Sequence, residues 1–391
     1  MAKTARTSAT VQAKVENAGA SGRGRKKRVQ PDVELPRDLE FELDRMERLA
    51  AVCDLHCQGK TVKEIQAEMK RRFGIEMRRE EPYTLISYAA SRGWLHFRAP
   101  HHYEYSHLLR NRFGWLQDVD VVRTATTQDF ASRAAEMLLR IVKDKVSAKK
   151  RDKKKDEVHI GFAGGVAIAH LASAFAELLC RPTRGLPEKI VLHAICAGFS
   201  PADPSTDPNA FFTYFLNKPL MQVETGFVGL HAPAIVNSAD IDMIKKQREV
   251  KTAIDGVKDL DIIVTSGSDW EDEHSLLAGH MAKEDPDSFK QLKKLGVEGD
   301  VMWRPLAASG GIDATTKLRA LTLMELEELQ GFIDKRKGSV LLMMGPCGGC
   351  SKPKGRITRV VLEVPKSIIT HLVVDSRSAA EMVRELGLYV D

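Results

Sequence analysis

Four short segments combine glycine with small hydroxyl or charged residues, each at or near the end of a predicted strand. They are Gly161-Phe162-Ala163-Gly164-Gly165, Thr265-Ser266-Gly267-Ser268, Gly299-Asp300 and Gly348-Gly349-Cys350-Ser351-Lys352. Glycine lets a phosphate approach the backbone amides at a helix N-terminus. Hydroxyl groups can donate to sugar or phosphate oxygens, a carboxylate can accept from sugar hydroxyls, and a lysine can pair with a phosphate. Taken singly, each segment is also typical of an ordinary turn.

Two cysteine pairs raise the question of a metal site. Cys347 and Cys350 form a single CxxC, and no second CxxC or HxxxH lies nearby in the sequence, whereas a structural zinc site uses four ligands. Cys53 and Cys57 are one helical turn apart and are expected to pack inside a small bundle. His101-His102 also lacks partners at ligand spacing. We therefore predict no metal and no cofactor.

Common catalytic signatures are missing. The sequence contains no GxSxG, no HExxH and no GxxxxGK[ST]. Acidic residues flank Trp270 and could bind a cation or act as acid and base, although a solvated loop is the expected interpretation; they are Asp269, Glu271, Asp272 and Glu273. These observations favour a binding protein over an enzyme.

Strands and helices alternate from residue 157 onward. Apolar runs predict strands over 158–163, 189–196, 261–265, 339–344 and 368–374, and helical spacing predicts helices over 166–180, 207–217, 240–257, 322–332 and 378–386. Buried strands separated by helices indicate an α/β fold with a doubly wound, largely parallel sheet. Ligands of such sheets bind at the carboxyl ends of the strands, where the four segments lie.

The N-terminal residues carry all of the excess positive charge. Residues 1–30 hold eight basic side chains and one acid, so this segment carries +7, whereas the whole chain carries +6. Residues 1–37 have almost no bulky apolar side chains and are predicted to form a disordered basic arm. Its densest part is Arg23-Gly24-Arg25-Lys26-Lys27-Arg28, and Arg25 and Lys26 are candidate DNA contacts, since such runs bind phosphates. A merely solubilising tail is the alternative.

Residues 38–98 predict three short helices. Leu43, Met46, Leu49 and Cys53 recur at helical spacing, Thr61 and Glu64 form a capping box for a second helix, and Pro82 suits the first turn of a third. With an extended piece near Trp94, this pattern is typical of a winged helix-turn-helix, although any small three-helix bundle would fit the same periodicity. The candidate DNA contacts are Arg78, Arg79, Tyr83, Thr84, Ser87, Tyr88 and Arg92.

The remaining division of the chain follows composition. We expect a linker at 99–126 and an effector domain at 127–391, with a helix from Thr127 to Val142. Residues 143–156 hold eight basic and three acidic side chains and are predicted to form a lysine-rich loop. No apolar run approaches the roughly 18 residues of a membrane span, and no apolar segment follows the basic start as in a signal peptide. With only six cysteines, these features predict a cytoplasmic protein without a disulfide scaffold.

Several segments resemble SorC-type (DeoR-like) bacterial transcriptional regulators, over roughly residues 40–390. They are Gly59-Lys60-Thr61-Val62-Lys63-Glu64-Ile65, Ala89-Ala90-Ser91-Arg92-Gly93-Trp94-Leu95, Leu108-Leu109-Arg110-Asn111-Arg112-Phe113-Gly114, Pro233-Ala234-Ile235-Val236, Leu295-Gly296-Val297-Glu298-Gly299-Asp300, Gly348-Gly349-Cys350-Ser351-Lys352 and Ile369-Thr370-His371-Leu372-Val373-Val374-Asp375. Ala167 stands where the family's glycine loop usually has a threonine.

The resemblance implies a helix-turn-helix followed by a Rossmann-like sugar-binding domain of the sugar-phosphate isomerase or deaminase type, without catalysis. It implies one effector pocket for a sugar or sugar phosphate, formed by Gly161, Ala163, Gly164, Gly165, Ser266, Gly267, Ser268, Asp300 and Lys352. It further implies a homo-oligomer, dimer or tetramer, on palindromic double-stranded DNA, within the bacterial nucleoid.

Two other interpretations stay open. The first is a sugar-phosphate isomerase or deaminase with a helical appendage, which would need an acid–base pair such as Asp300 with one of the acids at 269–273. The second is a regulator that has lost its ligand and acts through its DNA-binding part alone. Turnover of a sugar phosphate would favour the first, and the absence of ligand stabilisation would favour the second.

Overall fold

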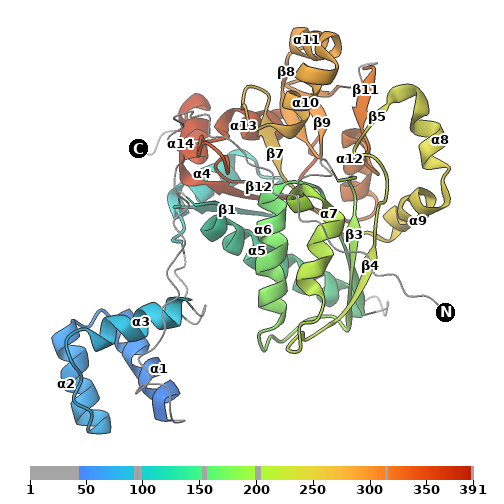
Figure 1. Ribbon diagram of the computed structural model, residues 1–391. Coiled ribbons are helices and arrows are strands. Elements are labelled where there is room, and N and C mark those ends of the chain that lie inside the picture. The colour runs from blue at the N-terminus through green and yellow to red at the C-terminus, as the bar shows by residue number, and fades with distance from the viewer. Residues whose placement is uncertain are drawn as a thin grey trace, which may run out of the picture. The chain divides into compact units, whose positions relative to one another are not determined.

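The computed structural model describes residues 44–91, 95, 99–124, 126–151, 156–198, 204–312 and 316–388. They belong to two compact units, residues 1–96 and 97–391 (Figure 1). The predicted basic arm with Arg25 and Lys26, and Arg92 beyond the third helix, lie outside the described residues. No helix in the described part of the chain is both long and apolar enough to span a membrane.

The first unit consists of three helices, α1 (Asp44–Cys57), α2 (Val62–Phe73) and α3 (Glu81–Ser91). The Thr61 hydroxyl accepts from the Glu64 amide while the Glu64 carboxylate accepts from the Thr61 amide, as the capping box predicts. Gly74 ends α2 in the left-handed conformation, with φ of 69°. One apolar core joins the helices, formed by Leu49, Val52, Leu55, Ile65, Met69, Leu85 and Ala89.

The second unit is organised by a sheet of seven parallel strands in the order β1-β13-β12-β6-β2-β3-β4. The strands are β1 (Asp118–Val122), β2 (Glu157–Phe162), β3 (Lys189–Ala194), β4 (Glu224–Val228), β6 (Ile262–Thr265), β12 (Ser339–Met344) and β13 (His371–Asp375). The predicted doubly wound parallel sheet is therefore confirmed. Because β2 is followed by β3 on one side and adjoins β6 on the other, the strand order reverses between β2 and β6.

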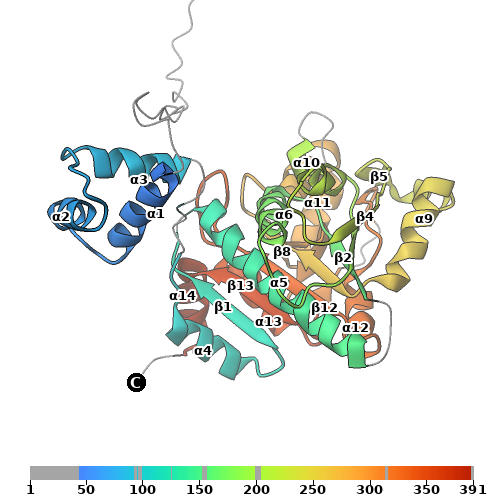
Figure 2. The same cartoon turned by 90° about the horizontal axis from the view of Figure 1, so that it is seen from below.

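Helices cover both faces of this sheet. The helices are α4 (Tyr103–Arg112), α5 (Thr127–Arg151), α6 (Val166–Leu179), α7 (Pro208–Phe211), α8 (Ile241–Lys245), α9 (Arg248–Gly256), α12 (Leu326–Asp334), α13 (Gly355–Glu363) and α14 (Ser376–Glu385). On β12, Leu341 and Met343 belong to the core cluster that holds the buried residues of α5 and α6, whereas Leu342 and Met344 belong to the cluster that holds those of α12, α13 and α14. This alternation is the period-two pattern of a strand buried on both sides. Figure 2 shows α5 running across the sheet, where it contacts β2, β12 and β13.

A smaller antiparallel sheet follows β6, in the order β10-β9-β8-β7. Its strands are β7 (Gly267–Asp269), β8 (Val297–Val301), β9 (Arg304–Ala307) and β10 (Gly310–Gly311), with α10 (Leu276–Glu284) and α11 (Pro286–Lys294) between β7 and β8. Strands β5 (Ile235–Asn237) and β11 (Leu318–Ala320) form a separate pair. Short 3-10 helices span Pro204–Thr206, Phe212–Phe215, Ser238–Asp240 and Val257–Asp259.

The lysine-rich loop predicted at 143–156 is wrong for its first nine residues, because α5 continues to Arg151. Val142 and Val146 keep the apolar stripe of the helix in the core. Lys149 is held along the helix, since its ammonium group donates to the Asp261 carboxylate and to the Glu157 carbonyl, both at 2.7 Å. The charged residues 143–151 therefore belong to a helix and surround its apolar stripe, and residues 152–155 lie outside the described residues.

The segment expected as a linker, 99–126, is part of the second unit. It supplies α4 and the edge strand β1, which pairs with β13 from Asp118–His371 to Val122–Asp375. Buried Asp120 on β1 forms an ion pair with His101, and burial raises the pKa of its carboxyl. The second unit therefore begins well before residue 127, a boundary that helix periodicity could not reveal.

Candidate functional site

A cavity of about 910 Å3 opens at the carboxyl ends of β2, β6 and β12. It lies where the strand order reverses, which is the position expected for a ligand in an open α/β sheet. The loop after β2 contributes Gly164 and Gly165, the loop after β6 contributes Ser266, and the loop after β12 contributes Pro346 to Gly349. The cavity therefore brings together residues that are almost 200 positions apart in the sequence.

The glycine loop after β2 forms one wall. Gly165 is the N-cap of α6 with φ of 118°, a conformation that L side chains rarely adopt, and it offers the first helical amides no side-chain acceptor. Val166, Ala167 and His170 of α6 continue this wall. An uncapped helix start facing a cavity favours an anion, because the amides and the helix dipole both point toward it.

Two residues predicted for this wall lie elsewhere. Gly161 is inside β2, where an added Cβ would lie 2.7 Å from the Ile195 side chain. Ala163 is buried and its amide donates to the Val264 carbonyl at 2.9 Å. Both residues shape the end of β2, whereas Gly164 and Gly165 line the cavity.

Asp300 is the buried carboxylate of the site, with 2% of its surface exposed. It accepts a hydrogen bond from Ser268, whose hydroxyl also lies 3.0 Å from that of Ser275. Burial raises the pKa of Asp300 to about 6, against the opposing effects of Ser268 and the positive charge of Lys354. Ser266, Gly267, Ser268 and Asp300 all line the cavity, as the sequence predicted.

Two lysines line the cavity, Lys283 and Lys354, whereas Lys352, which the sequence analysis placed there, does not. Lys352 is exposed, because its carbonyl accepts from the Cys347 amide and closes a turn that keeps its side chain outside. The Lys354 ammonium lines the cavity and donates to the Gly267 carbonyl at 2.8 Å. The signal available in the sequence was that Lys354 immediately precedes Gly355, where a helix begins.

Trp303 is a cavity residue that the sequence analysis missed. Met302 and Trp303 connect β8 to β9 with φ of 54° and 57°, the conformation of a tight hairpin turn that normally uses asparagine and glycine. The indole packs against Gly164, since an added Cβ there would lie 2.4 Å from the ring. Holding two bulky residues at positive φ costs on the order of 1–2 kcal/mol each, and such strain is concentrated at binding sites.

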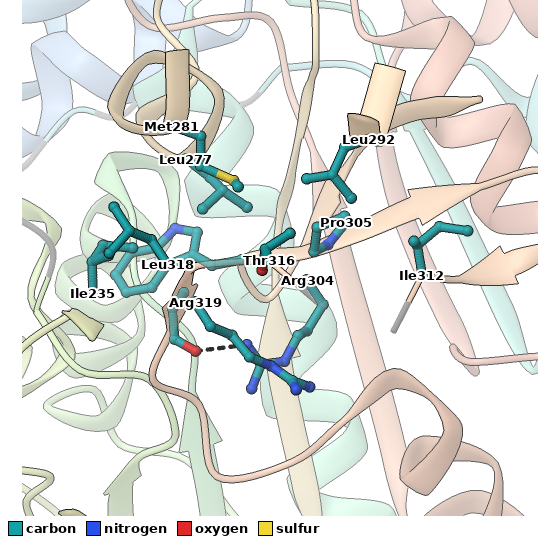
Figure 3. Close-up of a pocket in the computed structure, with 12 residues that line it drawn as sticks. Ile235, Leu277, Met281, Leu292, Arg304, Pro305, Ile312, Thr316, Leu318 and Arg319 are labelled. Atoms are coloured by element: carbon teal, nitrogen blue, oxygen red, sulfur yellow. Dashed lines mark hydrogen bonds between the residues drawn. The ribbon is translucent and has the colours of Figure 1, made fainter. Parts of the chain in front are cut away.

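A second cavity beneath α10 and α11 is much smaller. Figure 3 shows Leu277, Met281 and Leu292 on one side of it and Arg304 on the other. Arg304 donates to the Ala320 carbonyl at 2.6 Å and to the Glu325 carboxylate at 2.8 Å. Its volume is about 20 Å3, enough for about one water molecule and too small for a sugar.

The first unit presents the residues predicted to contact DNA on one side of α3 and on the turn before it. Tyr83 is 57% exposed and Ser87 is exposed one turn later, whereas Leu85 and Ala89 face the core. Thr84 and Tyr88 are half-buried at the edges of this surface. The third helix is therefore accessible along the face that the sequence indicated.

Cations near α3 differ in how they are neutralised. On α2, Arg71 and Arg72 bind the Glu68 carboxylate at 2.7 and 2.8 Å, and Lys70 binds Glu76 at 2.6 Å. Arg78 and Arg79 are exposed, and the described residues provide no ion pair for either of them. Among the described residues of the turn before α3, Arg78 and Arg79 are therefore exposed cations without an ion pair.

Comparison with known proteins gives a shared fold. No protein-family model matches the sequence, and no curated protein sequence is significantly similar to it. The full-length sorbitol operon regulator SorC from Klebsiella pneumoniae matches with a TM-score of 0.57 at 17% identity, covering 88% of this chain and all of that protein. The probable sor operon regulator from Shigella flexneri matches with a TM-score of 0.51 at 18% identity, over 72% of this chain and 98% of the other.

A third similar structure is the putative sugar-binding domain of a transcriptional repressor from Vibrio fischeri. Its TM-score is 0.52 at 12% identity, and the match covers 73% of this chain and 99% of that domain. The resemblance stated from the sequence is thus supported at the level of the fold.

The close packing at Gly164 makes a stability prediction. Gly164→Ala would place a Cβ 2.4 Å from the Trp303 ring and 2.9 Å from the Thr206 carbonyl oxygen. We expect the free energy of unfolding in urea to fall by about 1–3 kcal/mol, because overpacking forces neighbours to move. Gly279→Ala, on the same cavity with nothing within 4 Å of its added Cβ, is the control and should not be destabilised. Equal effects of the two substitutions would contradict the packing.

The buried carboxylate makes a pH prediction. Asp300 has a pKa of about 6 in the folded protein, against about 3.9 in an unfolded chain. Its contribution to stability is therefore complete below about pH 4 and is lost as pH rises through 6. Between these limits, the unfolding free energy of the wild type minus that of Asp300→Asn should fall by about 3 kcal/mol. A difference independent of pH in urea unfolding would show that Asp300 is not perturbed by burial.

Proposed function

We propose that this chain is a DNA-binding transcriptional regulator whose activity is set by a sugar or sugar-phosphate effector. The observation that carries the proposal is the cavity itself. It combines an uncapped helix start, a buried carboxylate and a lysine at the point where the strand order of a parallel sheet reverses. These groups are complementary to the two parts of a sugar phosphate, the anionic phosphate and the hydroxyl-bearing ring.

Each group has a defined task in this proposal. The amides at the start of α6, next to Gly164 and Gly165, would hold the phosphate, with the Lys354 ammonium as a point charge. The Asp300 carboxylate and the hydroxyls of Ser266 and Ser268 would bind the hydroxyls of the sugar. Ala167 has no hydroxyl, so binding of the phosphate would depend more on backbone amides and on Lys354 than in a protein with threonine at this position.

The comparisons support the regulatory assignment. The fold is shared with a sorbitol operon regulator and with a putative sugar-binding domain of a repressor, and the match to the first spans most of both chains. We carry over from these proteins the general arrangement of a DNA-binding unit with an effector domain. Such a protein would act in the bacterial cytoplasm on the nucleoid, as a homo-oligomer whose symmetry matches a palindromic site.

In the first unit, we propose that α3 enters the major groove. Tyr83, Thr84, Ser87 and Tyr88 would face base edges, and Arg78 and Arg79 would contact phosphates or guanine at the start of the helix. The basic residues Arg25 and Lys26 would add phosphate contacts from the arm. The effector would act by favouring one arrangement of the subunits over another and thereby changing the spacing of the two recognition helices.

The observation that favours an enzyme instead is the raised pKa of Asp300, because perturbed carboxyl groups in cavities are typical of general acids and bases. Burial explains the raised pKa without catalysis, and the partners of Asp300 give it a structural role. Ser268 and Ser275 connect the carboxylate to the start of α10, and Ser275 caps that helix. The network fixes the wall of the cavity, which is the task of a binding site.

DNA binding through Arg78 and Arg79 can be measured with a labelled mixed-sequence duplex. The double variant Arg78→Ala/Arg79→Ala should bind more weakly, and the slope of log K against log salt should become shallower by about 2, because about 0.9 counterions are released for each phosphate contact. Fluorescence anisotropy over a salt series gives both quantities.

The control variant removes two positive charges from the second unit. Lys246→Ala/Lys251→Ala affects two exposed lysines of α9 and the turn before it and should leave the salt slope unchanged. Equal slopes for the two double variants would contradict the role of α3. Absence of wild-type binding at low salt would contradict DNA binding altogether.

Effector binding can be measured by thermal unfolding with a panel of pentose and hexose phosphates and the free sugars. A ligand that binds the native state must raise the Tm. Lys354→Met should abolish the stabilisation by sugar phosphates, because it removes the cation that faces Asp300 and the Gly267 carbonyl.

Lys352→Met is the matched control, since it removes the same charge from the same loop outside the cavity, and it should keep the full Tm increase. The result against the proposal is no stabilisation of the wild type by any member of the panel. Conversion of a stabilising sugar phosphate in the same samples would establish an enzyme in place of a sensor.

A further inference from the structure

Four side chains with metal-binding atoms meet on the wall of the cavity. Asp272 and His274 come from the loop after β7, and Cys347 and Cys350 come from the loop after β12. One donor atom from each residue lies within 4.8 Å of every other. The His274 Nδ1 atom is 3.2 Å from the Asp272 Oδ1 atom, and the Cys350 Sγ atom is 3.8 Å from the same oxygen.

The loop after β12 makes a tight turn that holds Cys347 and Cys350 in the same cluster. The Ser351 amide donates to the Cys347 carbonyl at 2.8 Å, and Ser351 has φ of 59°, so the chain turns back directly after Cys350. The Cys347 amide donates to the Lys352 carbonyl at 2.9 Å, which closes the loop around the two cysteines.

The imidazole of His274 is seated directly against this loop. An added Cβ at Gly349 would lie 2.3 Å from the His274 ring, so the close approach requires glycine at that position. The Asp272 carboxylate accepts from the His274 amide at 3.0 Å, and only 8% of this residue is exposed. The His274 side chain is 43% exposed, which leaves the cluster accessible from the cavity.

We propose that Asp272, His274, Cys347 and Cys350 form a zinc-binding site. Two thiolates, an imidazole and a carboxylate are the ligand types that zinc prefers, and four of them complete a tetrahedral shell. Bonds of about 2.0–2.3 Å place tetrahedral ligand atoms roughly 3.3–3.8 Å apart, so the cluster needs to contract by about 1 Å to close on the ion. The inference does not depend on the proposed function.

The charges around the cluster agree with a bound cation. The Cys350 sulfur lies 3.8 Å from the Asp272 carboxylate, so two thiolates and a carboxylate would repel one another here without a metal. A divalent cation removes that repulsion and deprotonates coordinating thiols. Two thiolates and a carboxylate with zinc leave one negative charge, and the Lys354 ammonium lies close enough to act on Asp272.

A disulfide between Cys347 and Cys350 is the competing chemistry, because a CxxC can also be a redox pair. It would leave Asp272 and His274 without a role in the cluster, and all six cysteines are free in this structure. The metal accounts for all four side chains, since it joins the loop after β12 to the loop after β7. The site would therefore fasten together two walls of the cavity.

Elemental analysis of the purified, untagged full-length protein tests the proposal. We expect about one zinc per chain, retained through dialysis and released by a thiol-modifying reagent. Cobalt added to the zinc-free protein should give the visible bands of tetrahedral Co2+ and a sulfur-to-metal charge-transfer band in the near ultraviolet. Cys347→Ser/Cys350→Ser should lose the zinc, and His274→Gln should weaken zinc retention while preserving thiolate-to-cobalt charge transfer.

The matched control is the other closely spaced cysteine pair, since Cys53→Ser/Cys57→Ser changes the same two residue types in the first unit and should retain zinc in full. Zinc retained by Cys347→Ser/Cys350→Ser, or a wild type that binds neither zinc nor cobalt after reduction, would overturn the site. If the double cysteine variant does not fold, the cobalt spectra of the wild type and of His274→Gln decide the question.

Discussion

The position of β2 between β3 and β6 is the constraint on which the rest of this structure depends. Parallel strands all end at the same edge of the sheet, and the connections after β2 and β6 leave that edge on opposite sides. A crevice must open between them. The glycine loop, the serine loop and the cysteine loop all come to this crevice because of strand order. Strand order alone brings the three loops to the crevice, and the side chains on these loops then determine what it can bind.

The antiparallel sheet after β6 completes this crevice, and polar contacts hold it in place. The Gly267 amide donates to the Met344 sulfur at 3.2 Å, and the Gly267 carbonyl accepts from Lys354. The start of β7 is therefore fixed to the end of β12 and to the loop that follows. Asp300 on β8 lies opposite Ser268 in the register of β7 and β8, so the pairing of these strands places its carboxylate on the wall of the cavity. Both the candidate effector groups and the four-residue cluster rest on this single junction.

Much of the fold could be predicted from the sequence, since long apolar strands and capped helices carry local signals. The parallel sheet and the capping box at Thr61 follow from such patterns. The shared cavity of Gly164, Ser266 and Asp300 was expected only from the resemblance to a known family. The predictions that were wrong concern residues whose positions depend on tertiary contacts. The lysine-rich end of α5 resembles a solvated loop in the sequence, whereas Lys149 binds Asp261, which directly precedes β6. Lys352 and Lys354 are two positions apart, and only the turn that the chain makes between them decides which side chain lines the cavity. The CxxC appeared isolated because Asp272 and His274 lie more than 70 residues earlier in the sequence.

The turn at Met302 and Trp303 has one more consequence. Two large side chains at positive φ hold an indole against Gly164, directly before the exposed start of α6. Any molecule that settles on those helical amides must change the polarity around this ring, while two of the other three tryptophans lie in different settings, Trp270 stacked on Phe289 and Trp115 against Phe113. We therefore expect the emission of Trp303 to change when a ligand binds at the start of α6, which makes this residue an intrinsic fluorescent probe of the cavity.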